Sequence, residues 1–402
     1  MPKVKYIINA KIKPYGSGVS VRFLDHKNAV IVRKFHQGFA EYKNTPLITL
    51  PELAESLSLG AIYVKDESAR FGLNAFKVLG GSYAIGKYIA QKRGLDLETV
   101  DFSSLSANLD NGEKMTFVTA TDGNHGRGVA WSAQQLGHNA VVYMPHGSSE
   151  MRAQNIRNHG AECTITDVNY DDAVRIANEA AQKNGWIMVQ DTAWDGYSDI
   201  PKWIMQGYMT LASEIAEQIE QSNDPWPTHV ILQAGVGSFA GAVCGYLVEY
   251  LKEKAPVFIV IEPDNANCIF TSAQKGDGQP HAVTGSLTTI MAGLACGEPN
   301  ILSWPILRDY ASCFVSVDDS LSAMGMRILA SPLKNDTAIT SGESGAVGIG
   351  FLYEIMNNDE FSEFRHSLAL NLESRVLVVS TEGATSPDIY EQLVWQAADN
   401  NL

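Results

Sequence analysis

A lysine set among apolar residues is the first feature of this sequence that could do chemistry. Lys77 is flanked by Phe76, Val78 and Leu79, shortly before the pair Gly80-Gly81. A lysine that forms a Schiff base must be neutral part of the time, and an apolar, shielded setting favours the neutral amine. A lysine on the exposed face of an amphipathic helix is the more common arrangement. The assignment of Lys77 therefore depends on the residues that accompany it.

A polar turn follows the next apolar segment. Residues 116–121 are apolar and β-branched, and they run into Thr121-Asp122-Gly123-Asn124-His125-Gly126. A strand that ends in such a turn and starts a helix lets a ligand approach the backbone closely. The amide of Asn124 could donate a hydrogen bond to a phenolate oxygen. The alternative is a plain tight turn with Asn124 in the left-handed conformation. We assign no proton to His125, which can simply cap or pack.

A second glycine-rich turn is expected between a strand and a helix, at Gln233-Ala234-Gly235-Val236-Gly237-Ser238. Small residues let backbone N–H groups surround a phosphate, and the helix N-terminus adds a favourable dipole. The turn has no lysine of the kind that a nucleotide P-loop requires, and its glycine spacing does not fit a dinucleotide site. The alternative is a turn that only packs a helix against a strand.

Two further polar turns lie near the end of the chain, Ser341-Gly342-Glu343-Ser344-Gly345-Ala346 and Ser380-Thr381-Glu382-Gly383. Each adjoins a predicted helix or strand, so either could place a hydroxyl or a carboxylate beside a ring nitrogen. Solvated turns are the alternative interpretation.

Alternating strand and helix patterns must position these turns. We predict strands at residues 116–121, 140–144, 162–166, 187–190, 229–233, 257–261 and 376–381, and helices at residues 127–136, 149–158 and 171–183. This alternation indicates an α/β fold with parallel-type twisted sheets flanked by helices. In such sheets ligands bind beyond the carboxyl ends of the strands, where several of the polar turns lie. Residues 102–113 and 274–280 are predicted as loops, the second of them mobile.

The composition is that of a globular protein with room for an enclosed site. The chain has 402 residues, 45% hydrophobic and 19% charged, with a formal net charge of −15. That length is typical of about two or three domains. The acidic excess disfavours nucleic acid and anionic membranes as partners. We therefore expect neither as a partner, and an anionic ligand would need local donors.

The N-terminal segment and the cysteines bear on the compartment. Residues 1–16 lack the apolar core and cleavage site of a secretory signal, and no uninterrupted apolar stretch of about 20 residues is present. Five widely spaced cysteines without a Cys-x-x-Cys pair fit reduced thiols better than a disulfide or zinc framework, although an occasional regulatory pair is not excluded. We expect a cytoplasmic protein, and we assign no metal site.

In their order and character the five clusters resemble those of the pyridoxal-phosphate enzymes of the tryptophan-synthase β fold (fold type II), which include serine and threonine dehydratases. The resemblance runs from about Phe39 to Glu382. Within that fold the chain is most similar to the diaminopropionate ammonia-lyases. The strings that carry this similarity are Phe71-Gly-Leu-Asn-Ala-Phe-Lys77, Thr121-Asp-Gly-Asn-His-Gly-Arg-Gly128, Val189-Gln-Asp-Thr-Ala-Trp194 and Met291-Ala-Gly-Leu-Ala-Cys-Gly-Glu-Pro-Asn300.

The resemblance implies a cofactor, pyridoxal 5'-phosphate, and a role for each matching residue. Lys77 would hold the cofactor as a Schiff base and take the Cα proton of an L-substrate. Asn124 would contact the phenolic oxygen, and Thr381 would face the pyridine nitrogen. Glu343 would lie near the cofactor, in a turn that resembles a turn of the family. The phosphate would be held by Gly235, Val236, Gly237 and Ser238.

Two carboxylates distinguish this chain from the dehydratases. Asp122 stands where those enzymes have a small hydroxyl residue, and Asp191 follows a strand end. A carboxylate favours the ammonium form of a second substrate amine, which is the form that leaves. The resemblance also implies that Asp122 is the base on the opposite face if the D-isomer is accepted. Capping of a helix is the alternative for either residue.

The resemblance implies a lyase that converts 2,3-diaminopropionate, in D- and L-form, to pyruvate and two ammonia. The resemblance implies a homodimer with a large cofactor-binding domain (residues 1–85 and 198–402) and a small mobile domain (residues 86–197). A serine or threonine dehydratase, or another β-eliminating enzyme, is the alternative, and a cofactor-binding regulatory protein without turnover is a third. Tyr170, Trp194 and Tyr197 could wall the pocket, although each aromatic taken singly is more often a packing residue.

Overall fold

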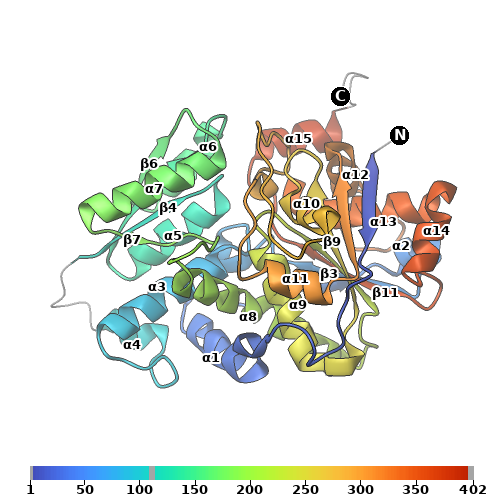
Figure 1. The fold of residues 1–402 in the computed structure, drawn as a ribbon, viewed down its shortest axis with the longest axis horizontal. Helices are drawn as coiled ribbons and strands as arrows, with labels where there is room; N and C mark the ends of the chain where they lie inside the picture. Colours follow the sequence, from blue (N-terminus) through green and yellow to red (C-terminus); the bar gives the residue numbers. More distant parts are fainter. Residues whose placement is uncertain (1–2, 108–113, 397–402) are drawn as a thin grey trace.

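Two β-sheets organise the computed structural model of the chain, which describes residues 3–107 and 114–396 (Figure 1). The smaller sheet has four parallel strands in the order β6-β5-β4-β7. Its strands are β4 (Thr116–Ala120), β5 (Asn139–Met144), β6 (Glu162–Ile165) and β7 (Ile187–Met188), and its helices are α5 (Asn124–Gln135), α6 (Glu150–Arg157) and α7 (Tyr170–Asn184).

The larger sheet has seven strands in the order β1-β10-β9-β8-β11-β3-β2. They are β1 (Val4–Ile8), β10 (Cys313–Val317), β9 (Val257–Pro263), β8 (His229–Gln233), β11 (Arg375–Ser380), β3 (Ala61–Asp66) and β2 (Leu47–Thr49). The five central strands are parallel, whereas β1 and β2 pair antiparallel at the two edges. The predicted α/β fold with parallel-type sheets is confirmed. The two antiparallel edge strands were not predicted.

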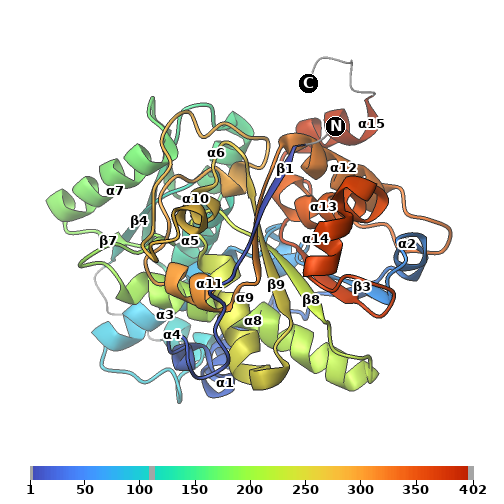
Figure 2. The same cartoon turned by 45° about the vertical axis from the view of Figure 1, so that its right-hand side comes forward.

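Helices cover both faces of the larger sheet and fill the space between the sheets. They are α1 (His26–Gln37), α2 (Pro51–Ser56), α3 (Val78–Lys92), α4 (Phe102–Ala107), α8 (Asp199–Ser222), α9 (Ser238–Leu251), α10 (Cys268–Lys275), α11 (Trp304–Tyr310), α12 (Asp319–Ala330), α13 (Glu343–Asn357), α14 (Ser362–Ser367) and α15 (Pro387–Trp395). The long helix α8 and helix α3 pass between the two sheets, and α12 to α15 gather on the far side of the larger one (Figures 1 and 2). None of the helices in the described part of the chain is long and apolar enough to cross a membrane.

Alternation along the central strands explains these layers. In β8, Val230 and Leu232 belong to the core shared with α3, α8 and α9, whereas Ile231 belongs to the core shared with α12 and α13. In the smaller sheet, Phe117 faces the α5 and α6 side and Val118 faces α7. Successive residues of a strand point to opposite faces, so a strand with apolar residues at every position is buried on both sides.

The predicted strands and helices agree with the structure to within a few residues at each end, which is the usual uncertainty of such boundaries. The predicted loop at 102–113 is wrong in its first half, because residues 102–107 form α4. Asp101 caps this helix by accepting from the backbone N of Ser104 at 2.9 Å, and Phe102 stacks on Phe39 with ring centroids 3.8 Å apart. The remainder of that segment, residues 108–113, lies outside the described residues.

Candidate active site

The polar turns predicted from the sequence meet at one pocket between the two sheets. Nine of the candidate residues line it: Lys77, Asp122, Asn124, Asp191, Gly235, Val236, Gly237, Ser238 and Thr381. They come from the carboxyl ends of β4, β7, β8 and β11 and from the start of α3. The tenth candidate, Glu343, lines an adjoining cavity that shares Asp122 and Tyr170 with this pocket.

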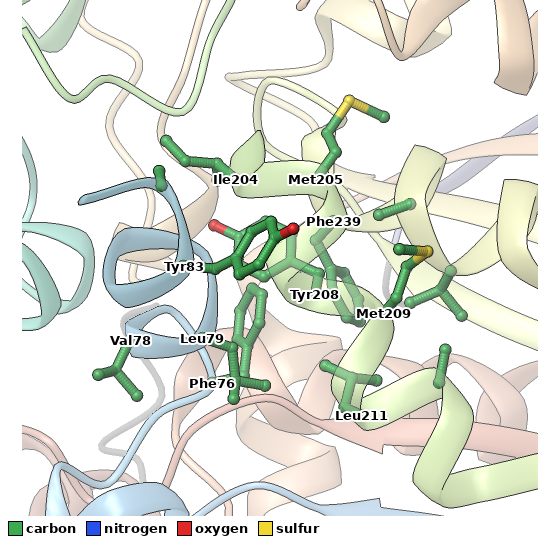
Figure 3. Packing of buried hydrophobic residues seen from close by; sticks show 14 of the residues in the cluster. Phe76, Val78, Leu79, Tyr83, Ile204, Met205, Tyr208, Met209, Leu211 and Phe239 are labelled. Carbon is green, nitrogen blue, oxygen red and sulfur yellow. The ribbon is translucent and has the colours of Figure 1, made fainter. Parts of the chain in front are cut away.

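Lys77 immediately precedes α3 and lies against an apolar layer. Phe76, Val78 and Leu79 are buried, as the sequence predicted. Phe76 packs on Tyr208 and Phe239 with ring centroids 4.8 and 4.7 Å apart (Figure 3). This layer excludes water from one side of the amine. Lys77 is therefore not a surface lysine.

Asp191 is the ionic partner of Lys77. Its Oδ2 lies 2.5 Å from Nζ of Lys77, and the hydroxyl of Tyr170 donates to its Oδ1 at 3.3 Å. Burial alone would raise the pKa of Asp191, but the charge and hydrogen bond of Lys77 lower it to about 2. Burial alone would lower the pKa of Lys77, but Asp191 raises it above its usual value. The apolar setting predicted a neutral amine, but Asp191 favours the ammonium form of Lys77 in this pocket.

Asp122 belongs to a second charged group in the pocket. Its Oδ2 is buried without a hydrogen-bond partner and lies 3.7 Å from Nη1 of Arg152. Burial raises the pKa of Asp122 to about 6, opposed by Arg152 and Lys77. Helix α5 begins after Gly123 and receives no side-chain cap there, so capping does not account for Asp122. A carboxylate that titrates near neutral pH is suited to act as a base.

Glu343 and Glu382 add two buried carboxylates to this group. Nη2 of Arg152 lies 4.0 Å from Oε2 of Glu343. Burial raises the pKa of Glu343 to about 7, with a further rise from Glu382. Glu382 accepts from the backbone N of Ser344 at 2.9 Å and from the amide of Asn124. Glu382 therefore orients the Asn124 side chain.

The glycine-rich turn after β8 leads into helix α9. Gly237 has φ +94°, and a Cβ on it would lie 2.8 Å from Oγ of Ser303. The first turn of a helix leaves N–H groups without intrahelical partners, which suits an anion. Asn300 braces the turn, since its backbone N donates to Val236 O at 2.8 Å and its amide donates to Oγ of Ser238 at 2.6 Å.

Thr381 follows β11 and touches Gln233 at the end of β8. The amide nitrogen Nε2 of Gln233 contacts the carbonyls of Ser344 and Val379 at 3.0 and 2.9 Å and Oγ1 of Thr381 at 3.0 Å. Carbonyl oxygens can only accept, so the nitrogen of the Gln233 amide faces Thr381. The hydroxyl of Thr381 accepts there, which leaves its proton available for a group in the pocket.

Several residues of the site were not identified from the sequence in these roles. Arg152 is the main one, although its spacing to buried Ile156 places it on the inner face of α6. The braces provided by Asn300, Glu382 and Gln233 depend on contacts between distant segments.

Trp194 and Tyr197 stack with centroids 4.3 Å apart and do not line the pocket, whereas Tyr170 does. His125 lines the pocket, its Nε2 donates to Val189 O at 2.8 Å, and burial lowers its pKa.

Comparison with known proteins agrees with this geometry. Residues 39–380 match the family described as "Pyridoxal-phosphate dependent enzyme". A diaminopropionate ammonia-lyase of Salmonella typhimurium is 58% identical over 396 residues, which cover 98% of each chain. The structure of the Escherichia coli diaminopropionate ammonia-lyase in complex with D-serine superposes with a TM-score of 0.92 at 50% identity, covering 98% of this chain and 97% of that one. The Escherichia coli enzyme with an aminoacrylate-PLP azomethine reaction intermediate gives a TM-score of 0.91 at 50% identity, covering 98% of both chains.

The fold and the lysine-centred pocket are those of a fold type II pyridoxal-phosphate enzyme. Within that class the chain belongs to the family of diaminopropionate ammonia-lyases.

The residues of the pocket fit pyridoxal 5'-phosphate. The turn of residues 234–238 lines the pocket and leads into the N-terminus of α9, which suits a phosphate. Lys77 places an amine in this pocket, and Thr381 places there a hydroxyl whose oxygen accepts from Gln233. The chain is a pyridoxal-phosphate enzyme.

Proposed function

We propose that the chain eliminates ammonia from 2,3-diaminopropionate and that hydrolysis then yields pyruvate and a second ammonia. One substrate molecule and one water give one pyruvate and two ammonia. The observation that carries the choice of substrate is the contact between Asp191 and the ammonium of Lys77. A carboxylate placed to hold one ammonium in this pocket can hold the β-ammonium of a substrate. A substrate with a neutral β-hydroxyl would form no ion pair with that carboxylate.

Bound pyridoxal phosphate supplies an electron sink that makes the Cα proton of an amino acid removable. We propose that Lys77 removes this proton from the L-isomer and that Asp122 removes it from the D-isomer. The raised pKa of Asp122, about 6, places the carboxylate in its basic form at neutral pH and still leaves it able to accept a proton. Asp191 keeps the departing amine protonated, while the apolar layer of Phe76 and Phe239 excludes water.

For the cofactor we propose that Gly235, Val236, Gly237 and Ser238 hold the phosphate. Asn124, oriented by Glu382, contacts the phenolic oxygen, and Thr381 donates to the pyridine nitrogen. Glu343 acts from the adjoining cavity through Arg152. We propose the lysine as the point of attachment because Lys77 lines the pocket that holds these groups.

We further propose two domains, a large one (residues 1–85 and 198–402) and a small mobile one (residues 86–197) that closes on substrate. The smaller sheet lies wholly within the second range, and residue 86 falls within α3. We also propose a homodimer in the cytoplasm, acting in amino-acid degradation. The five unpaired thiols support that compartment, and analytical ultracentrifugation tests the dimer.

A coupled pyruvate assay on D-diaminopropionate, L-diaminopropionate and serine tests the function. We expect both diaminopropionates to be faster than serine, and Asp122→Asn to reduce turnover of the D-isomer far more than that of the L-isomer. A faster rate on serine would favour the dehydratase. Cofactor binding without pyruvate from any amino acid would favour a regulatory protein.

Borohydride reduction and peptide mapping test the attachment point independently. The label should fall on Lys77, and Lys77→Ala should abolish labelling. Label on another lysine, such as the buried Lys65, would overturn the assignment.

A further inference from the structure

Arg152 connects the two parts of the structure at the cavity that adjoins the pocket. It lies on α6, beside the smaller sheet, yet its Nε donates to Oγ of Ser386 at 3.0 Å, in the segment that follows β11 of the larger sheet. Its side chain is only 9% exposed. In the same guanidinium, Nη1 lies 3.7 Å from Oδ2 of Asp122 and Nη2 lies 4.0 Å from Oε2 of Glu343.

The turn that carries Asp122 is shaped around this side chain. Gly123 has φ +152°, and a Cβ on it would lie 3.1 Å from Cδ of Arg152. A side chain at position 123 would therefore require the Arg152 side chain to shift.

Charge makes Arg152 the main counter-ion of Asp122. The groups that act on Asp122 are Arg152 from α6, Lys77 before α3, Glu382 after β11, Glu343 at the start of α13, Tyr170 from α7 and Cys296. Arg152 is the larger of the two cationic influences, and Lys77 is paired with Asp191 at 2.5 Å. Without Arg152, the carboxylates of Asp122, Glu343 and Glu382 would repel one another, and Lys77, already paired with Asp191, would be the remaining cation that acts on Asp122.

We propose that Arg152 is a positioning residue that holds Asp122 ionised and aimed into the pocket, and that it thereby supports turnover of the D-isomer in particular. This inference rests on the proposed role of Asp122. Arg152 acts through Asp122, and its bond to Ser386 fixes the guanidinium in place.

The test compares Arg152→Gln and Arg152→Lys with the parent holoenzyme in pH profiles of kcat on each isomer. The Gln variant should lower the D/L ratio of kcat about twofold at pH 7 and about tenfold near pH 5. It should also move the acid limb of the D-isomer profile upward by on the order of one pH unit, because removal of an adjacent opposite charge raises a carboxyl pKa. The Lys variant retains the charge and should restore most of the ratio. Arg157→Gln is the matched control, since Arg157 lies on the same helix and pairs with exposed Glu150.

Calorimetric binding of D-serine across the same pH range gives a readout that does not depend on turnover. Asp122→Asn should remove the pH dependence of binding near pH 6, and Arg152→Gln should shift it upward. Equal losses on both isomers with an unmoved acid limb would overturn the inference, as would an unmoved binding profile. A parent enzyme that releases no pyruvate from the D-isomer would instead contradict the proposed function, and the binding profile would still decide the role of Arg152.

Discussion

The amide of Gln233 and the hydroxyl of Thr381 are 3.0 Å apart at the ends of the neighbouring strands β8 and β11. Because the same amide nitrogen also contacts two backbone carbonyls, its orientation is determined by the main chain. Thr381 can then only accept from it and must direct its own proton elsewhere. A neutral donor held in this way suits a pyridine nitrogen that remains unprotonated.

Thr381→Val should weaken binding of pyridoxal phosphate roughly five- to tenfold, because the ring nitrogen loses one hydrogen bond worth about 1 kcal/mol. The visible absorption of the bound cofactor should shift as well. Thr381→Ser retains the hydroxyl and is the control. Equilibrium dialysis and absorption spectra measure both effects, and equal affinity of the Val variant and the parent would rule out the contact.

Gly237→Ala should impair the phosphate-binding turn. Alanine is strained at φ +94°, and its Cβ would lie 2.8 Å from Ser303 Oγ. We expect cofactor affinity to fall on the order of tenfold or more. Gly94→Ala is the matched control, because Gly94 has φ +67° with nothing within 4 Å of the added Cβ. If both variants lose affinity equally, backbone strain is the whole effect and the turn has no special role.

Glu214→Gln should destabilise the protein by about 3 kcal/mol. Oε2 of Glu214 lies 2.8 Å from Nζ of Lys65 and 2.7 Å from Nη2 of Arg70, and all three side chains are fully buried. Neutralising the carboxylate leaves an excess of buried positive charge. Chemical denaturation measures the free energy of unfolding. Glu217→Gln, on the same helix and paired with Arg33 at the surface, should cost far less. Similar losses for the two variants would contradict this account.

Glu343→Gln should stabilise the protein above neutral pH. The pKa of Glu343 is raised to about 7 in the folded state, against about 4.3 in an unfolded chain. The folded state then binds more protons between these values, so the parent loses stability as the pH rises through that window. Glutamine does not titrate and so avoids this loss. The free energy of unfolding of the variant should exceed that of the parent by about 1–3 kcal/mol near pH 8 and should equal it below about pH 4. Thermal melting at several pH values, with exposed Glu41→Gln as control, measures the difference. A gain independent of pH would argue against a raised pKa.

Local patterns were enough to predict most of the strands, and they failed where a contact between distant segments decided the outcome. The β8 strand is predictable because five buried residues between turn signals have few other solutions. Helix α4 was missed because its polar composition indicates a loop, and its stability comes from the cap at Asp101 and from Phe102 stacking on Phe39.

The sequence by itself predicted which residues would hold the cofactor, because the lysine segment and the glycine-rich turns are short strings that together resemble the motifs of one family. Only the tertiary structure decided how they are paired: Lys77 with Asp191, Thr381 with Gln233, and Asp122 with Arg152. It also decided that Glu343 lies in the adjoining cavity and not in the pocket itself. These pairings join segments up to about 150 residues apart, and the charge state of a buried carboxylate depends on such neighbours, which no local pattern of residues encodes.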